Sequence, residues 1–168
     1  MAEESVQRWK GTVSTKLEKT RAEQAWPLVK DFFNLHKRYP TLPTCYGVHG
    51  TNGEPGCIRY CAGSTIPSDD GSESVSWSKE RLVAVDDADR SIKYEIVESN
   101  IGFKSYEATM KISDDGSNGN GCVIEWSFEV EPVQGWVFED LQTKYREGLQ
   151  LMGTKMEDEI ATMLNGGC

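Results

Sequence analysis

Cysteine and histidine are the residues of widest chemistry in this chain, and their spacing limits what they could do. There are five scattered cysteines and two histidines, His36 and His49. Neither histidine lies at ligand spacing from a cysteine pair, and Cys57 and Cys61 fall on one face of an expected strand without further ligands. A Cys–His or Ser–His–Asp site would need one of these histidines beside the nucleophile. We therefore expect no metal and no cofactor.

Two charged residues, Arg59 and Glu80, lie in expected strands. Arg59 shares a strand face with Cys57 and Cys61, which fits an inward orientation, although an arginine in mid-strand more often faces water. Glu80 has charged neighbours on both sides, as solvated strands often do. The pattern leaves both orientations open. If both residues face inward, they must pair with each other or with a ligand, because an unpaired charge is costly in apolar surroundings.

The middle of the chain has the two-residue periodicity of strands that bury one face. Strands are expected over residues 8–17, 46–48, 56–62, 75–85, 91–98, 103–112 and 122–130, with a polar loop over 63–74. Tyr94, Tyr106 and Trp126 lie on the apolar faces of their strands, where they either pack in the core or line a pocket. The alternation predicts an antiparallel sheet with one buried face.

Helical signals flank this sheet. Thr20 and Glu23 form a capping box that predicts a helix start, and Pro27 predicts that this helix is short or kinked. From about 137 to 164 apolar residues recur every three or four positions, which predicts a long amphipathic helix. Part of its methionine stripe, including Met152, could shape a cavity wall.

The composition is that of a soluble globular protein, with 38% hydrophobic and 27% charged residues. We expect a single domain over 1–168, with 1–6 as a loose terminus. The net charge of -9 disfavours nucleic acid as a partner, and no stretch approaches a membrane span. The polar N-terminus and the odd number of cysteines favour a cytoplasmic or nuclear protein with reduced thiols.

The expected architecture is α+β, with a curved antiparallel sheet of about seven strands wrapped around the long C-terminal helix. A single helix laid across a curved sheet often leaves a gap instead of a packed seam. We therefore expect a cavity of a few hundred Å³ that holds a small hydrophobic molecule.

The order of elements resembles the Bet v1/START-like helix-grip superfamily, which includes polyketide cyclase-like proteins and abscisic acid receptors. Local motifs resemble the lachrymatory factor synthases within it, over about residues 8–160. The segments that carry this resemblance include Gly56-Cys57-Ile58-Arg59-Tyr60, Lys79-Glu80-Arg81-Leu82-Val83-Ala84, Tyr106-Glu107-Ala108-Thr109-Met110 and Trp126-Ser127-Phe128.

The resemblance implies a cofactor-free rearrangement of a small 1-alkenyl sulfenic acid to a thial S-oxide. In that case Glu80 moves the proton and Arg59 holds the polar S–O group, while Tyr94 and Tyr106 line the pocket. The loop with Ile66 and Pro67 differs from these synthases and would act as a gate. The residues at Ser76 and around Met152 also differ and are expected to touch the cavity.

The abscisic acid receptors are a second comparison. Gly56–Arg59 and Thr65–Pro67 resemble their gate region. However, their ligand-binding lysine falls near Pro43, and their latch falls near 101–103, where the sequence does not match. A hormone receptor of that type is disfavoured.

Three functions remain. The first is binding of a small hydrophobic or amphipathic metabolite, with Trp126, Met152, Ile66 and Pro67 among the contacts. The second is the cofactor-free isomerase that uses Glu80 and Arg59. The third is a ligand-gated adaptor for a protein partner that the sequence does not identify, supported only by analogy with the hormone receptors. Binding ranks first, because domains of this kind bind ligands more generally than they catalyse reactions.

Overall fold

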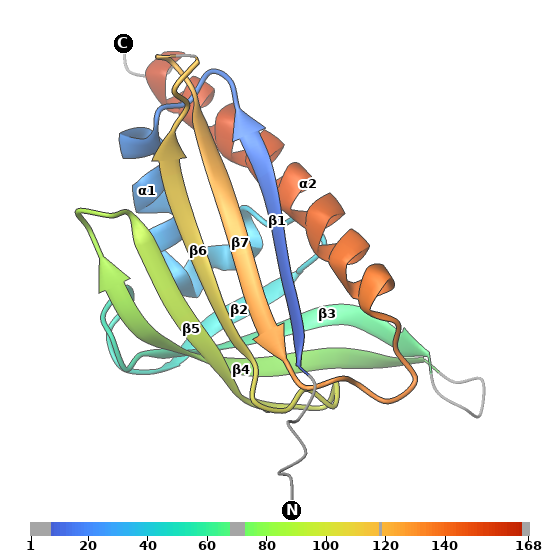
Figure 1. The fold of residues 1–168 in the computed structure, drawn as a ribbon. Helices are drawn as coiled ribbons and strands as arrows, with labels where there is room; N and C mark the ends of the chain where they lie inside the picture. Colours follow the sequence, from blue (N-terminus) through green and yellow to red (C-terminus); the bar gives the residue numbers. More distant parts are fainter. Residues whose placement is uncertain (1–7, 68–72, 118, 166–168) are drawn as a thin grey trace, which may run out of the picture.

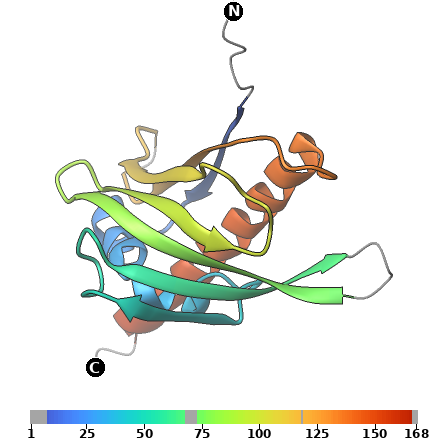
Figure 2. The same cartoon turned by 90° about the horizontal axis from the view of Figure 1, so that it is seen from below.

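A seven-stranded antiparallel sheet curves around one long helix in the computed structural model, which describes residues 8–67, 73–117 and 119–165 (Figures 1 and 2). The strand order is β1-β7-β6-β5-β4-β3-β2. The strands are β1 (Trp9–Leu17), β2 (Thr44–His49), β3 (Ile58–Pro67), β4 (Glu73–Asp86), β5 (Ser91–Ser99), β6 (Glu107–Asp114) and β7 (Cys122–Val130). The sequence prediction of a helix-grip α+β fold is confirmed.

The inner face of the sheet is set by the alternation of side chains. On β7 every second residue from Cys122 to Val130 is buried, and β6 buries Ala108, Met110 and Ile112 in the same way. Trp126 is paired with Met110 of β6 on one side and with Val13 of β1 on the other. The apolar faces therefore coincide across the strands and form one core surface.

The long β3–β4 hairpin corrects the expected loop over 63–74. β3 continues to Pro67 and β4 begins at Glu73, so 63–67 and 73–74 lie in strands, with 65–67 paired to 73–75. The register shifts between Ala62 and Thr65, where Gly63 has a φ of 143° and lies against Pro43. This irregularity separates two paired halves of one hairpin, which a polar composition alone does not reveal. The expected gate lies largely outside the described residues, as do the side chains of Ile66 and Pro67.

The first helix, α1 (Ala22–Lys30), starts one residue later than predicted. Its N-cap is Arg21, whose backbone N–H donates to the side chain of Gln24 at 2.9 Å. Thr20 is instead buried, so its side chain belongs to the core and not to the expected capping box. α1 contains Pro27 and ends at Lys30, and Asp31 separates it from the 3₁₀ helix η1 (Phe32–Lys37).

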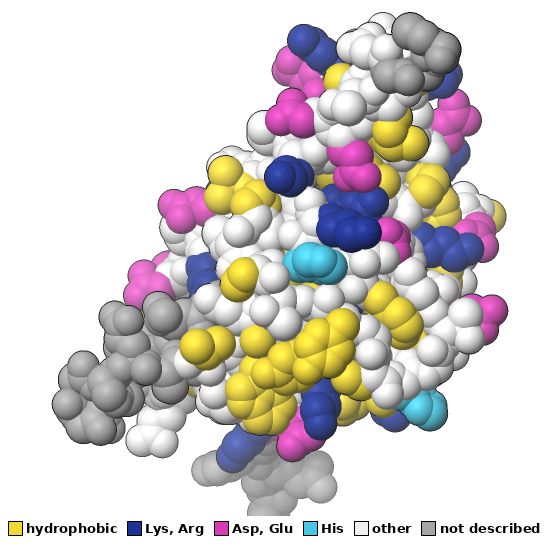
Figure 3. Space-filling view, turned by 180° about the vertical axis from the view of Figure 1, so that it is seen from behind, with side chains coloured by type: hydrophobic (Ala, Val, Ile, Leu, Met, Phe, Trp, Pro, Cys, Tyr) yellow, Lys and Arg dark blue, Asp and Glu magenta, His cyan; other side chains and the backbone are white. Residues whose placement is uncertain are grey.

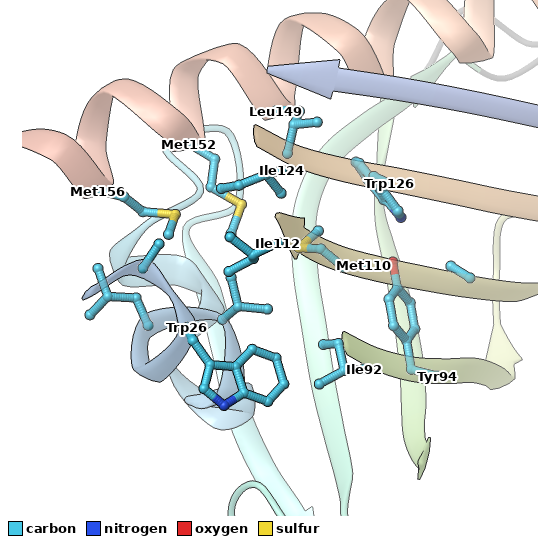
Figure 4. Packing of buried hydrophobic residues seen from close by; sticks show 14 of the residues in the cluster. Trp26, Ile92, Tyr94, Met110, Ile112, Ile124, Trp126, Leu149, Met152 and Met156 are labelled. Carbon is cyan, nitrogen blue, oxygen red and sulfur yellow. The ribbon is translucent and has the colours of Figure 1, made fainter. Parts of the chain in front are cut away.

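The last helix, α2 (Phe138–Asn165), lies across the inner face of the sheet and packs chiefly on β1 (Figure 1). Leu141, Leu149, Met152, Met156 and Ile160 are buried, whereas Met163, which the helical stripe included, is exposed. Figure 4 shows Met152 and Met156 reaching from α2 toward Ile112 on β6 and Trp26 on α1. The core is therefore shared by the sheet, α1 and α2. Within the described residues, no helix is long and apolar enough to cross a membrane.

β6 begins at Glu107, later than the predicted Phe103, because Ser105 adopts a φ of 55° and interrupts the extended chain. Tyr106 nevertheless stays buried.

The outer face of β2, β3 and β4 carries a ladder of aromatic side chains. The ring centroids of Tyr46 and Tyr60 lie 5.1 Å apart, and those of Tyr60 and Trp77 lie 6.0 Å apart. Hydrophobic side chains also gather on the surface seen from behind in Figure 3. Cross-strand aromatic contacts of this kind stabilise the long hairpin and the edge strand β2.

Candidate functional site

A cavity of about 150 Å³ lies between the inner face of the sheet and the helices. The predicted residues Arg59, Glu80, Tyr94, Tyr106, Trp126 and Met152 all line it, and so does Ser76. The cavity is smaller than the few hundred Å³ expected, because large side chains from η1 and α2 fill part of the space. A volume of about 150 Å³ accommodates a molecule near the size of benzene.

Arg59 and Glu80 form a buried ion pair at the cavity wall. They are cross-strand partners on β3 and β4, so their side chains leave the sheet side by side. The Arg59 Nε–Glu80 Oε1 distance is 2.8 Å, and the Nη2–Oε1 distance is 2.7 Å. Only 4% of Arg59 and 9% of Glu80 is exposed. Both side chains therefore face the interior and not solvent.

The remaining hydrogen-bonding capacity of this pair is partly used by neighbours. Arg59 Nη1 donates to the carbonyl oxygen of Phe32 at 2.9 Å, and Ser78 Oγ donates to Glu80 Oε2 at 3.0 Å. The guanidinium lies 3.7 Å from the ring centroid of Phe32 and 5.2 Å from that of Tyr94. Burial disfavours the charged form of Arg59. The adjacent carboxylate of Glu80, together with other neighbours, outweighs this effect and raises the pKa of Arg59. Arg59 stays a cation whose charge is balanced locally.

Two thiols extend this polar cluster. Cys45 on β2 is the cross-strand partner of Cys61 on β3, and their Sγ atoms lie 3.7 Å apart. Cys61 donates toward Cys45, which lowers the pKa of the Cys45 thiol and raises that of Cys61; the nearby Arg59 guanidinium further lowers the Cys45 pKa. Cys61 also approaches Glu80 Oε1 at 4.0 Å and lines the cavity. Cys45 is therefore the more acidic of the two thiols, and only Cys61 lines the cavity.

Tyrosine hydroxyls provide the other polar groups of the cavity. Tyr94 and Tyr106 are almost fully buried, and burial raises the pKa of both well above that of a free phenol. Burial also raises the pKa of Tyr39 to about 12 and raises that of Tyr145. All four remain neutral phenols around pH 7, so they can donate a hydrogen bond without adding charge.

Several residues that line the cavity or contact the Arg59 cluster behind its wall were missed by sequence reasoning. Ser78 shares its strand face with Glu80, so alternation could have placed it, whereas Phe32, Tyr39 and Cys45 reach the cluster only through tertiary packing. Tyr145 was visible in the helical stripe but not as a cavity residue. Among the described residues no group of three or more His, Cys, Asp or Glu side chains could hold a metal ion.

Comparison with known proteins is consistent with this architecture. The family described as polyketide cyclase / dehydrase and lipid transport matches residues 8–157. The chain belongs to this family. MLP-like protein 423 of Arabidopsis thaliana is 32% identical over 118 residues, which cover 67% of this chain and 70% of the relative.

Solved structures support the fold. Ginseng major latex-like protein 151 from Panax ginseng superposes with a TM-score of 0.67 at 20% identity, covering 90% of this chain and 97% of the other. Protein XoxI from Bacillus cereus gives a TM-score of 0.66 at 20% identity, covering 92% of this chain and 96% of the other. This chain thus has the Bet v1-like helix-grip fold and belongs to the Bet v1/START-like superfamily.

Proposed function

We propose that the protein binds a small, mostly apolar molecule in the cavity between the sheet and α2. The observation that carries this proposal is the cavity itself, whose wall combines apolar side chains with one internally balanced ion pair, Arg59–Glu80. Hydrophobic contacts would supply most of the affinity, and the ion pair with Ser78 would orient a polar group. Membership of a family described by lipid transport supports a hydrophobic ligand.

Fluorobenzene tests this proposal, because its size suits a cavity of about 150 Å³ and its fluorine signal reports binding directly. Saturable broadening or a shift of the fluorine resonance is expected with the wild type. Ser76→Leu, which places a larger side chain at the cavity wall, should abolish it. Val83→Leu is the matched control, since Val83 lies on the same strand but is 42% exposed.

Unchanged fluorobenzene binding by Ser76→Leu would locate the ligand elsewhere and defeat the proposal. If Ser76→Leu does abolish binding, native mass spectrometry of the wild type, Val83→Leu and Ser76→Leu is the next measurement. A small molecule that co-purifies with wild type and Val83→Leu, but not with Ser76→Leu, would identify the natural ligand class.

A second candidate is catalysis without a cofactor, as in the lachrymatory factor synthases. The observation that favours it is the position of a carboxylate and a guanidinium, 2.7 Å apart, on the wall of a cavity of small-substrate size. Glu80 would take the O–H proton of a 1-alkenyl sulfenic acid and return a proton to the alkene carbon. Arg59 would hold the oxygen that stays on sulfur, and the product thial S-oxide has the same atoms as the substrate.

Freshly generated 1-propenyl sulfenic acid, with product followed by gas chromatography, separates the two functions. The isomerase predicts thial S-oxide from the wild type and none above background from Glu80→Gln, which still binds fluorobenzene. Turnover that survives in Glu80→Gln would exclude Glu80 as the acid/base group. Binding of fluorobenzene without turnover by the wild type would leave the protein as a binding module.

A further inference from the structure

The indole N–H of Trp126 has no hydrogen-bond partner among the described residues, although Trp126 is only 7% exposed and lines the cavity. The other buried tryptophan, Trp26, shows the usual arrangement, because its Nε1 donates to Asp87 Oδ1 at 2.9 Å. Buried indole N–H groups are normally satisfied. The free donor on the cavity wall therefore points to an acceptor on a ligand.

The Trp126 ring is fixed in this orientation by its neighbours. Its centroid lies 4.2 Å from that of Tyr145, with the planes 16° apart, and the Tyr39 ring meets it edge-on at 6.3 Å. Turning the indole toward a protein acceptor would disrupt both contacts. The direction of the N–H group is therefore set by the packing of Trp126 on β7 against Tyr39, which follows η1, and Tyr145 on α2.

Tyr94 supplies a second donor to the same space. Figure 4 shows Trp126 on β7 and Tyr94 on β5, with the indole nitrogen and the phenol oxygen directed toward one another across β6. Tyr94 is 4% exposed and lies within hydrogen-bonding reach of Tyr106. Burial keeps Tyr94 protonated, so its hydroxyl can donate to a ligand.

We propose that the Trp126 N–H and the Tyr94 O–H together bind one uncharged acceptor oxygen of the ligand, of the carbonyl or sulfinyl class. This donor pair rests on the proposed binding function and specifies its ligand. Two donors converging on one oxygen suit a C=O or S=O group, which has two lone pairs and needs no proton of its own.

The charges around the cavity favour a neutral ligand over an acid. The buried cation, Arg59, is already paired with Glu80, so a carboxylate ligand would add a second buried negative charge. Lys144 also lines the cavity but is exposed to solvent and lies over the Trp136 ring at 5.9 Å. A neutral acceptor oxygen therefore fits the donor pair better than an anion does.

Cyclohexanone and methylenecyclohexane form a matched probe pair, since they differ by an oxygen in place of a methylene group. With ¹⁵N-labelled protein, cyclohexanone should shift the Trp126 indole N–H resonance strongly downfield, and methylenecyclohexane should not. The Trp26 resonance, already bonded to Asp87, is the internal control and should move with neither probe. Trp126→Phe assigns the resonance by removing it.

The affinities of the same probes test the donor directly. Trp126→Phe should weaken cyclohexanone about 3- to 10-fold more than it weakens methylenecyclohexane, as expected for one lost hydrogen bond. Tyr94→Phe should do the same, whereas Trp26→Phe should affect both probes equally. The difference between probes is insensitive to a general loss of stability, because that loss affects both.

The results with these probes separate the donor pair, the preference for an uncharged oxygen and binding in the cavity. If both probes bind the wild type but Trp126→Phe weakens them equally, the donor pair is wrong and cavity binding stands. Tighter binding of cyclohexanecarboxylate than of cyclohexanone would likewise overturn the preference for an uncharged oxygen. If neither uncharged probe binds a wild type that still binds fluorobenzene, the donor pair fails and cavity binding stands; if fluorobenzene does not bind either, the proposed function fails as well.

Discussion

Arg59 is surrounded by Phe32, Tyr94 and Glu80, and only Glu80 compensates its charge by ion pairing. Side-chain alternation predicted which residues share a strand face, but not that the face with Arg59 and Glu80 points inward. β4 carries charged and apolar residues on both faces, and on β3 the face opposite Arg59, with Ile58 and Tyr60, is the more apolar one, so periodicity does not identify the inner side. The resemblance to lachrymatory factor synthases picked out both residues, whereas the pairing itself is visible only in the structure.

Removing one partner of this ion pair should be more harmful than removing both. We expect Glu80→Leu to lower the free energy of unfolding by about 3–5 kcal/mol, since it leaves the Arg59 guanidinium buried without a counter-charge. The double variant Arg59→Met/Glu80→Leu should recover most of that loss. Urea denaturation followed by tryptophan fluorescence measures both. A double variant no more stable than Glu80→Leu would contradict this account.

Cys45 and Cys61 should form a disulfide when the reduced protein is treated with diamide, a two-electron thiol oxidant. Directly opposed strand residues have Cα separations compatible with a disulfide, and the Sγ atoms need only close from 3.7 Å to about 2.0 Å. Two thiols lose two hydrogen atoms, and diamide takes them up as the hydrazine. Because the Cys45 pKa is lowered, the reaction should remain fast below the usual thiol pKa of about 8.5.

Peptide mapping by mass spectrometry identifies the link. Cys57 and Cys122 serve as internal controls, because both are buried free thiols whose pKa burial raises. They should still react with an alkylating agent after unfolding, whereas Cys45 and Cys61 should not. Cys45→Ser should prevent the link, and a disulfide that instead involves Cys57 or Cys122 would refute the prediction.

At the scale of elements, α2 is fastened to the rest of the molecule in two ways. Arg38, which follows η1, bonds Glu159 of α2 through Nε at 2.9 Å and Nη2 at 2.8 Å, and bonds Asp31 through Nη1 at 2.6 Å. Gly148 and Gly153 let other parts approach the helix closely, namely Tyr39 and the end of β1. The periodicity of α2 predicted the helix and its buried side, but not which residues anchor it. Those partners are distant in sequence, and none has a local signature.

Loss of the Arg38–Glu159 contact should show in the pH dependence of stability. The hydrogen bond from Arg38 lowers the pKa of Glu159 below its usual 4.5, so the folded state binds protons less readily than the unfolded state. The stabilisation is complete above about pH 5 and is lost as the pH falls through the lowered pKa. Glu159→Gln should therefore cost about 1–2 kcal/mol at pH 7, with the gap to wild type narrowing below pH 4.

Asp158→Asn is the matched control, because it makes the same change of charge at an exposed neighbour on the same helix. The difference in unfolding free energy between Asp158→Asn and wild type should not narrow in the same way between pH 5 and 3. Chemical denaturation at a series of pH values gives both curves. A constant gap between wild type and Glu159→Gln across this range would show that the Arg38 contact does not favour the ionised carboxylate.

The two helix glycines should respond differently to alanine. A Cβ at Gly148 would lie 1.9 Å from Tyr39 Oη, whereas at Gly153 it would lie 3.1 Å from Leu17 and Thr15. We expect Gly148→Ala to lose about 1–2 kcal/mol of unfolding free energy, because displacing Tyr39 outweighs the gain in helix propensity. Gly153→Ala should be close to neutral. Urea denaturation compares them, and equal effects would mean that Tyr39 moves freely.

On the scale of the whole molecule, the order of elements predicted the fold because each helix and strand carries its own local pattern. Strand periodicity over 91–98 and 122–130 and helical periodicity over 137–164 agree closely with β5, β7 and α2. The structure departs from prediction where the backbone changes course, as at Arg21, Gly63 and Ser105. The cavity volume could not be predicted, since it is the small difference left after side chains from many elements have packed.

The pairing of β1 with β7 affects how the molecule is assembled during synthesis. β1 is made before its partner β7 and before the helix that covers it, α2, and five other strands lie between β1 and β7 in the chain. β1 therefore stays unpaired until β7 has been made, and this long-range pairing makes folding slow compared with a helical protein of this length. During that interval its free edge is open to other chains. An edge strand of the finished sheet is thus the strand whose pairing partner lies farthest along the chain, which makes it the strand of the nascent protein longest exposed to association with other chains.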